Sequence, residues 1–568
     1  MKKILITVCT AFMLANLNAQ TIQDGINHLY ADRFKNAEQT FQKILATNPN
    51  VAEATYWLGQ TYLDMDNNDA ARQLYDKALA ANGNNPLIMV GKGHVLLLDK
   101  KKDEARQLFE SALTLSTTKK GEDAVILNAI GRANVDSKEG NLDYAVQVLE
   151  RAMQRDPKNA DIALNLGNAY RKRDIGVGGK AYESYKAATD INPRFAYPYV
   201  RIAKIYETQR QWDLVLDNLN KAVQVDPSFS LGYYELFFYY FFVKQDYAMA
   251  EQMLQKYVST RPNEDQWEHD YLSAQLCWAR KDYNCAVTKA ENVKASLGAR
   301  VKPRVLNLLA YSYLGKGDFA TAKTYVDEFF AKEKEGFVGP DYQLKVDIYS
   351  AAGVPCDQLY AVYMEGAVAD TVLQSRIDYM AKAADYFKSK NCKMQEADMR
   401  MAWFDTRKNA SPTYLINFGI LYLQADALPK ADSIFARYIS LAPDSIYGYH
   451  WRGRTNYSLD TTMTIEPYVT NMVTNYDKAL TIAGTDAMRY RSQGLTAAKT
   501  LAAFYVNMRS SRDTALAYAY KGLAIDSTDA ALKSIRDMLE KTKNQKPAGK
   551  TTGSNKPSAS IRKPGDKG

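Results

Sequence analysis

The sequence predicts an all-α fold in which one helical hairpin is repeated along most of its 568 residues. A pattern of a small, a large and a small residue, four and three positions apart, recurs at steps of mostly 34 to 36 residues. A glycine or alanine precedes most of these patterns, and a proline follows many of them. A hairpin of this kind buries one face against itself and leaves another uncovered, so it needs a neighbour. The hairpins are therefore expected to stack into an α-solenoid.

The clearest unit runs from Tyr56 to Pro86. On either side of a polar turn at 66–69, apolar residues recur three and four positions apart, which predicts two amphipathic helices. Gly59 and Ala71 are small, and two antiparallel helices can cross closely where one side chain is nearly absent. Pro86 ends the second helix, because proline cannot continue an α-helix.

The same features recur in the units before and after this one. The patterns of the second helices begin at Ala37, Ala71, Ala105, Ala145, Ala181, Val215, Ala250, Ala286, Ala322 and Ala431. The small residue of the first helices recurs as Gly25, Gly59, Gly93, Gly131, Gly167, Ala203, Ala274, Ala310, Gly419 and Gly453. An ordinary helical bundle is not expected to hold one period over so many units.

This pattern resembles the tetratricopeptide repeat family, whose unit is a helix–turn–helix of about 34 residues. The resemblance extends from about residue 20 to about residue 540. It implies about thirteen or fourteen units that form a right-handed superhelix with a concave groove. In such a protein each unit contacts mainly its neighbours, so there is no single core.

The chain is expected to divide into five segments. These are a signal peptide at 1–19, regular repeats at 20–295, degenerate helical repeats at 296–408, further repeats with a cap at 409–540, and a tail at 541–568. The signal peptide is predicted from a lysine pair, an apolar run and a small residue, Ala19, at which cleavage is expected. No later run reaches the roughly 18 apolar residues that a membrane span needs.

The net charge of +9 is concentrated at the ends of the chain. The tail at 541–568 carries eight lysine or arginine residues and one acid, whereas residues 4–540 are neutral overall. This tail is rich in Pro, Gly, Ser and Thr, lacks an apolar pattern and is expected to be disordered. A solubilising end is one interpretation, and weak attachment to an anionic surface is the other.

Four cysteines follow the signal peptide, which suits an oxidising compartment and permits three pairings. Cys277 and Cys285 lie on either side of one predicted turn, and Cys356 and Cys392 lie at the turns of successive units. We therefore predict the disulfides Cys277–Cys285 and Cys356–Cys392. A metal site built from thiolates is the rival interpretation, but no closely spaced Cys-x-x-Cys pair occurs.

The sequence carries no motif for catalysis. It has no His-Glu-x-x-His, no Gly-x-Ser-x-Gly and no nucleotide-binding loop. Its four histidines fall in separate units, and no stretch outside the repeats is long enough for a catalytic domain. We therefore expect a protein that is not an enzyme and that has no catalytic residues, no metal ion and no cofactor.

In the family that the chain resembles, first-helix residues line the concave groove, and some members grip a partner's terminal carboxylate there. Alignment on the small position places six polar residues along one inner strip: Arg132, Asn165, Asn168, Arg171, Arg201 and Lys204. Asn165 and Arg201 match clamp positions, whereas Asn128, Arg132 and Tyr197 depart from the family pattern, so the family's specificity is not carried over. The strip still favours an acidic segment or carboxylate, and a solvated face without a ligand is the alternative.

Two further groups of residues are candidates for partner binding. Aromatic residues surround the helix expected at 233–242, which is either buried in the core or offers Tyr239 and Phe242 as an apolar ledge. A second inner strip consists of Tyr447, Trp451 and Arg454.

Together these features predict an exported scaffold, periplasmic or associated with an outer membrane. It would bind protein or peptide segments, acidic ones among them, and assemble or organise a cell-envelope complex. The alternative is an envelope protein that binds carbohydrate or another polymer through its aromatic inner residues. Neither a specific nucleic-acid partner nor a transmembrane span is expected.

Overall fold

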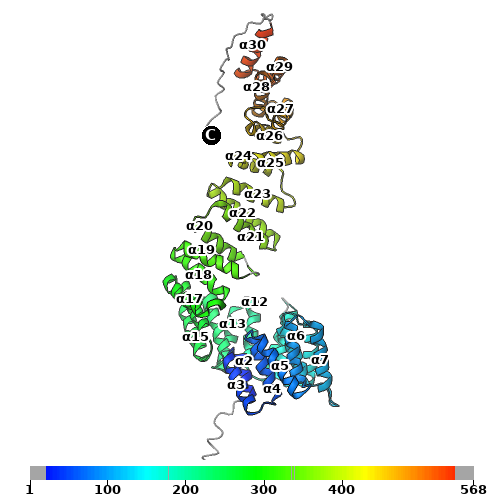
Figure 1. Ribbon diagram of the computed structural model, residues 1–568, viewed down its shortest axis with the longest axis vertical. Coiled ribbons are helices and arrows are strands. Elements are labelled where there is room, and N and C mark those ends of the chain that lie inside the picture. The colour runs from blue at the N-terminus through cyan, green and yellow to red at the C-terminus, as the bar shows by residue number, and fades with distance from the viewer. Residues whose placement is uncertain (1–20, 175, 177, 334–335, 338, 544–568) are drawn as a thin grey trace, which may run out of the picture. The chain divides into compact units, whose positions relative to one another are not determined.

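The computed structural model describes residues 21–543 except 175, 177, 334–335 and 338. Within this part of the chain the fold is an α-solenoid of 29 α-helices without strands (Figure 1). The chain divides into two compact units between Lys332 and Glu333, a boundary that lies inside the segment 296–408 predicted to be degenerate. The predicted signal peptide at 1–19 and all but the first residues of the predicted tail lie outside the described residues.

The described part of the amino-terminal unit contains nine hairpins. Their helices are α2 (Ile22–Tyr30) and α3 (Phe34–Thr47), α4 (Ala52–Asp64) and α5 (Asn68–Asn82), α6 (Pro86–Leu98) and α7 (Lys102–Ser116), α8 (Ala124–Asp136) and α9 (Leu142–Arg155), α10 (Ala160–Arg173) and α11 (Gly179–Ile191), α12 (Ala196–Thr208) and α13 (Trp212–Val225), α14 (Ser230–Phe238) and α15 (Tyr247–Ser259), α16 (Gln266–Ala279) and α17 (Tyr283–Leu297), and α18 (Pro303–Lys316) and α19 (Phe319–Lys332). A π-helical turn, η1 (Tyr239–Lys244), extends α14, and a 3-10 turn, η2 (Gly298–Arg300), follows α17.

The described part of the carboxyl-terminal unit contains five hairpins and a final helix. These are α20 (Gly339–Ala351) and α21 (Cys356–Ala369), α22 (Leu373–Ser389) and α23 (Lys393–Thr406), α24 (Thr413–Gln424) and α25 (Leu428–Leu441), α26 (Ile446–Leu459) and α27 (Tyr468–Thr485), α28 (Arg491–Asn507) and α29 (Arg512–Ile525), and α30 (Ala530–Lys543). The repeats expected from the sequence are therefore present in both units. Within the described residues, no helix is long and apolar enough to cross a membrane.

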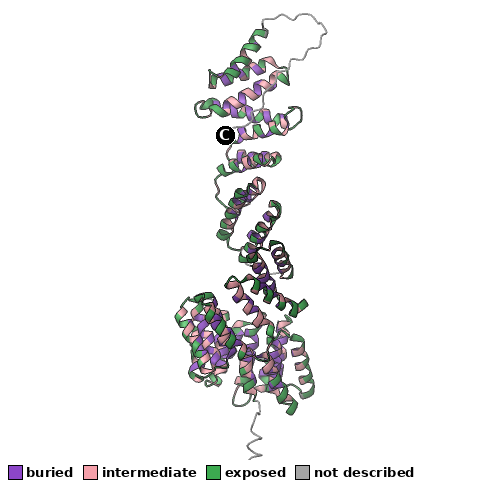
Figure 2. Ribbon diagram, turned by 90° about the vertical axis from the view of Figure 1, so that its left-hand side faces the viewer, coloured by how far each residue is buried: buried purple, intermediate pink, exposed green. Residues whose placement is uncertain are grey.

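Several hairpins close around the small residue of their first helix. A Cβ atom on Gly59 would lie 2.1 Å from Cζ of Tyr75, a ring that is completely buried. The same geometry brings Gly167 against Tyr185, where a Cβ atom would lie 2.5 Å from the ring. Buried residues accordingly run along the seams between packed helices, while exposed residues cover the outer sides (Figure 2).

The turn inside many hairpins depends on one residue with a left-handed backbone conformation. Residues that share this position and a positive φ include Asp32, Asp66, Lys100, Arg210, Lys281, Asn391 and Asp426. Aspartate and asparagine tolerate this region better than most other residues, which suits the polar composition of these turns. The left-handed residue reverses the chain so that the second helix can return along the first.

The first hairpin also packs against the seventh and eighth, so the amino-terminal unit closes on itself. Arg261 Nε donates a hydrogen bond to the carbonyl oxygen of Asp32 at 3.1 Å. The backbone N–H of Lys35 donates to Glu264 Oε1 at 2.8 Å, and the ammonium group of Lys35 pairs with Asp265. These partners are 229 or 230 residues apart in the sequence.

Apolar contacts accompany this closure. The rings of Tyr30 and Tyr197 stack with centroids 5.3 Å apart, and Phe195 lies 5.6 Å from Tyr30. Ala31 is fully buried in one cluster with residues of α12 to α14, and its carbonyl oxygen accepts a hydrogen bond from the Ser230 hydroxyl. In Figure 1, α2 accordingly lies beside α13. The contact of the first hairpin is thus both apolar and polar.

Both predicted disulfides are present. Cys277 and Cys285 join the two helices of the eighth hairpin, with Cα atoms 5.7 Å apart. Cys356 and Cys392 join successive hairpins of the carboxyl-terminal unit, with Cα atoms 6.3 Å apart. Both separations lie in the normal range for a disulfide. Among the described residues, no group of three or more His, Cys, Asp or Glu side chains is placed to hold a metal ion.

Candidate functional site

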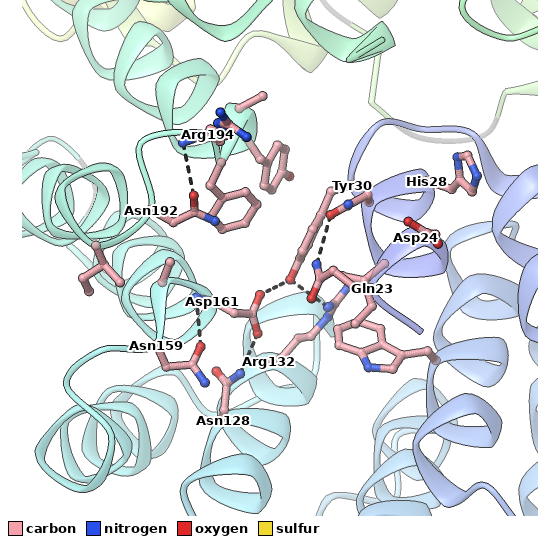
Figure 3. A pocket seen from close by; sticks show the side chains of 18 of the residues that line it. Gln23, Asp24, His28, Tyr30, Asn128, Arg132, Asn159, Asp161, Asn192 and Arg194 are labelled. Carbon is pink, nitrogen blue, oxygen red and sulfur yellow. Dashed lines mark hydrogen bonds between the residues drawn. The ribbon is translucent and has the colours of Figure 1, made fainter. Parts of the chain in front are cut away.

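The closure of the first hairpin creates a pocket of about 1000 Å³, here called the closure pocket (Figure 3). One wall comes from α2 and the residues just after it. The facing wall consists of the amino-terminal ends of α8, α10 and α12 together with the turns that lead into α10, α12 and α14. Its lining mixes aromatic side chains, such as Trp57 and Phe195, with amides and charged groups, such as Asn159 and Arg194.

Tyr30 projects into the centre of the closure pocket and carries its main hydrogen-bond network (Figure 3). The Tyr30 hydroxyl donates to Asp161 and accepts a hydrogen bond from Arg132 Nη1 at 3.2 Å. Asp161 Oδ2 accepts further hydrogen bonds from Asn128 at 2.6 Å and from Asn165 at 3.2 Å. Burial and the nearby carboxylate of Asp161 hold the pKa of Tyr30 well above its usual value, so the hydroxyl remains a donor.

Arg132 closes the inner side of this network. Its guanidinium lies 4.5 Å from the ring centroid of Trp57 and 5.3 Å from that of Tyr30, and its Nε lies 3.3 Å from Asp136 Oδ2. Arg132 is only 7% exposed and Asn165 only 4%. This network therefore lines the inner side of the pocket.

A series of buried, hydrogen-bonded side chains lies next to the Arg132 network, on α4, α5 and α6. The Tyr75 hydroxyl donates to the carbonyl oxygen of Tyr56 at 2.8 Å and accepts from Gln60 Nε2 at 2.9 Å. Gln60 Oε1 lies 3.1 Å from His94 Nδ1, which must therefore be the protonated nitrogen. Burial lowers the pKa of His94 to about 4, so the imidazole is neutral at physiological pH.

The next members of the predicted inner strip use their polar groups within the protein. The Tyr185 hydroxyl donates to Asn168 Oδ1 at 2.9 Å. Arg171 donates to the backbone carbonyl oxygens of Arg201 and Lys204, at 3.5 and 3.3 Å. Asn168 and Arg171 thus hold α10 to α11 and α12.

Arg201 and Lys204 are likewise engaged. The Arg201 guanidinium lies 4.9 Å from the ring centroid of Tyr197, and its Nε is buried without a hydrogen bond. Lys204 Nζ forms ion pairs with Glu207 at 3.0 Å and with Glu235 at 2.5 Å. Of the strip predicted to bind an acidic segment, Arg132, Asn165 and Asn168 are buried inside the unit, and Tyr30 and Asp161 engage the first two. Arg171, Arg201 and Lys204 are half-buried.

One carboxyl group inside the unit titrates unusually. Burial raises the pKa of Asp32 to about 7, against a partial opposing effect of Arg261. Asp32 therefore binds a proton more readily than an ordinary aspartate, because the enclosed site disfavours its charge.

Sequence reasoning named Arg132 among the residues of this pocket but missed Tyr30, Asp161 and Arg33. Tyr30 and Asp161 are 131 residues apart, and Arg33 lies in a turn that the repeat pattern assigns no role. No local signal in the sequence connects these positions. Only the return of the first hairpin to the later repeats brings them together.

The aromatic helix of the seventh hairpin is partly core and partly surface. Tyr239 is buried, at 3% exposure, and its hydroxyl has no hydrogen-bond partner. Phe242 is 62% exposed and stacks on Phe238, with ring centroids 5.7 Å apart. The π-helical turn η1 shifts the register here, so the two residues predicted to form one ledge differ in exposure.

The second predicted strip lies on α26 in the carboxyl-terminal unit. Tyr447 is 39% exposed and contacts Tyr490 edge to face, with centroids 6.3 Å apart. Trp451 stacks on Phe435, and the Arg454 guanidinium lies 5.2 Å from the Trp451 ring centroid. These three residues share one helix face.

Residues 28–88 match the sequence model of a tetratricopeptide repeat. No curated protein matches the chain. Among solved structures, a tetratricopeptide repeat protein from Parabacteroides merdae is 17% identical, with 46% of this chain and 98% of that chain covered and a TM-score of 0.38. The Cut9-Hcn1 hetero-tetramer of APC/C is 13% identical over 91% of this chain and 95% of that chain, with a TM-score of 0.34. Yeast Tom70 is 14% identical, with 80% of this chain and 98% of that chain covered and a TM-score of 0.32.

Proposed function

Because the chain is a tetratricopeptide-repeat protein, we propose that it is a scaffold that binds segments of other proteins and performs no catalysis itself. We further propose that it is exported and that it assembles or organises a complex in the cell envelope. The proposal on location is supported by the apolar amino-terminal pattern and by the two cysteine pairs, which suit an oxidising compartment.

The closure pocket is the observation that carries the proposed binding role. Its volume of about 1000 Å³ lies at the upper end of the range for sites that enclose a ligand. Aromatic faces such as Trp57 offer apolar contact, and side chains such as Asn159 and Arg194 offer hydrogen bonds. The network of Tyr30, Asp161 and Arg132 adds polar groups to the inner side of the pocket.

The proposal is tested by filling the pocket. Val125 lines it and is 53% exposed, so Val125→Trp adds bulk to the pocket without disturbing a buried seam. Leu115 on α7 is 55% exposed and lies outside the pocket, so Leu115→Trp is a matched control. Partner proteins are captured by crosslinking in intact cells that make the protein, followed by mass spectrometry.

We expect Val125→Trp to lose the captured protein partners and Leu115→Trp to retain them. The same partners should be recovered with an envelope fraction. Equal capture by both variants would show that the closure pocket is not the binding site. Recovery of the chain with cytosolic proteins alone would contradict the proposed location.

A further inference from the structure

Arg33 is a buried cation in the closure pocket that the fold leaves without a partner. The residue is 9% exposed, and its Nε is sealed from solvent with no hydrogen bond. Among the described residues, no hydrogen bond or ion pair of its guanidinium is found, and Nε is the only one of its three nitrogens that is sealed from solvent without a partner. His28, which also lines the pocket, likewise has a buried Nδ1 without a partner. Two unused polar groups of the first hairpin therefore share one wall.

A guanidinium with one sealed and unpaired nitrogen opposes folding, because burial removes part of the water that would solvate its charge. The cost is visible in the pKa of Arg33, which burial lowers from its usual range, while Asp226 and Glu264 act in the opposite sense. If position 33 only had to be filled, an apolar side chain would make the folded chain more stable than an arginine does. The arginine is therefore better explained by a ligand than by the packing of the hairpin.

The two nearby acids are already in use. The Asp226 carboxylate accepts hydrogen bonds from the backbone N–H and the hydroxyl of Ser228, at 2.8 and 2.7 Å. Glu264 Oε1 accepts the backbone N–H of Lys35 at 2.8 Å. Neither acid comes within ion-pairing distance of Arg33. Both weaken the local positive potential, but neither supplies the hydrogen bonds that the guanidinium lacks.

The position of Arg33 is fixed by the closure of the unit. Its backbone N–H donates to the carbonyl oxygen of His28 at 2.9 Å, and its own carbonyl oxygen accepts from Ala37 in the first turn of α3. The preceding residue, Asp32, has a φ of 54° and is held through its carbonyl oxygen by Arg261. The side chain is thus presented by a turn that the eighth hairpin locks in place.

We infer that Arg33 is the anchor for a carboxylate of the bound protein segment. This inference rests on the proposed function and names the chemistry that the closure pocket recognises. A guanidinium offers paired N–H donors that match the two oxygens of a carboxylate, whether the carboxylate ends a chain or belongs to an aspartate or glutamate.

Ligand binding should also hold the unit closed. Arg33 belongs to the first hairpin, whereas the facing wall comes from the fourth to seventh hairpins. A ligand that contacts both walls binds the closed form better than an open one, and mass action then favours closure. Slower amide hydrogen exchange in residues 22–47 would report this ligand-dependent closure of the first hairpin.

The test compares Arg33→Met with Arg194→Met in the full chain. Both variants remove one cation from the same pocket, but Arg194 is exposed at the rim. The probes are fluorescein-labelled decapeptides from a randomised library, each made in three forms. The first form has a free carboxyl terminus, the second is amidated there, and the third is amidated with every Asp and Glu replaced by the amide residue.

We expect the wild-type protein to bind the third form more weakly than the first. Weak binding of the second form as well would show that the recognised carboxylate is the terminal one. Arg33→Met should weaken binding about tenfold or more, as expected for the loss of hydrogen bonds to a charged group. Arg194→Met should change binding much less. Without a peptide, Arg33→Met should leave exchange in residues 22–47 unchanged or slower, because a buried unpaired charge is gone.

Two results would overturn the inference. If Arg33→Met accelerates exchange in the absence of a peptide, the arginine supports the fold instead of a ligand. If peptides bind equally well without any carboxylate, or equally well to Arg33→Met, the anchor is elsewhere. In that case binding that is still blocked by Val125→Trp would leave the proposed function standing. Failure of every peptide to bind the wild-type protein would contradict both.

Discussion

Replacement of Gly59 by alanine tests the close crossing on which several hairpins of this fold depend. The new Cβ atom would lie 2.1 Å from Cζ of Tyr75 and 2.2 Å from its hydroxyl oxygen. Tyr75 is completely buried, and its hydroxyl holds Tyr56 and Gln60. The ring has to shift for the methyl group to fit, and the polar chain that leads to His94 then shifts with it.

The cost follows from three contributions. Overpacking a core by one methyl group costs about 1–3 kcal/mol. Displacing the Tyr75 hydroxyl removes two buried hydrogen bonds worth about 1 kcal/mol each. Alanine regains about 1 kcal/mol of helix propensity over glycine. We therefore expect Gly59→Ala to lower the local free energy of unfolding by about 3 kcal/mol.

Native-state hydrogen exchange is the suitable assay, because repeat proteins open locally and a single global transition is not assured. Exchange in α4 and α5 should become about a hundred times faster, which corresponds to about 3 kcal/mol. Gly484→Ala is the matched control. Gly484 lies in α27, where an added Cβ atom would meet no atom within 4 Å. This control should stabilise α27 by about 0.5–1 kcal/mol and therefore slow its exchange slightly.

One result would refute the reasoning. If Gly59→Ala stabilised α4 and α5 as Gly484→Ala is expected to stabilise α27, the glycine would not be required for close approach. The regular spacing of small residues would then have another cause.

Three further predictions concern pH and the disulfide. Between about pH 8 and about pH 6, the contact of the first hairpin should gain about 1.4 kcal/mol, because the folded chain, in which the pKa of Asp32 is about 7, binds the proton more tightly than the unfolded chain. Asp32→Asn, which tolerates the left-handed turn, should remove this dependence of hydrogen exchange on pH. At about pH 5 the free energy of unfolding should be about 2 kcal/mol lower than at neutral pH, because His94 has a pKa of about 4 in the folded chain and takes up a proton only when the chain unfolds. Urea unfolding of His94→Gln should not show this loss of stability. Replacement of both Cys356 and Cys392 by serine opens a loop of 36 residues and should cost about 4 kcal/mol by the chain-entropy relation, so an unchanged thermal transition would contradict the structural role of this disulfide.

The sequence by itself determined the repeated hairpin. Gly59 and Tyr75, or Gly167 and Tyr185, lie within about twenty residues of each other, so their contact follows from local helix periodicity and one turn. The pairing of Cys277 with Cys285 is local for the same reason. Stacking of neighbouring units then follows, because each hairpin leaves one apolar face uncovered.

The tertiary structure alone decided that the first hairpin meets the seventh and eighth. This contact depends on the small rotation between successive repeats, added over several units, and no single motif encodes that sum. It brings Tyr30 to Asp161 and places Arg33 in a pocket wall. The inner strip predicted at Arg132 and Asn165 indeed lies inside the unit, but their polar groups face Tyr30 and Asp161 there, because the returning hairpin occupies the space that a partner was expected to fill.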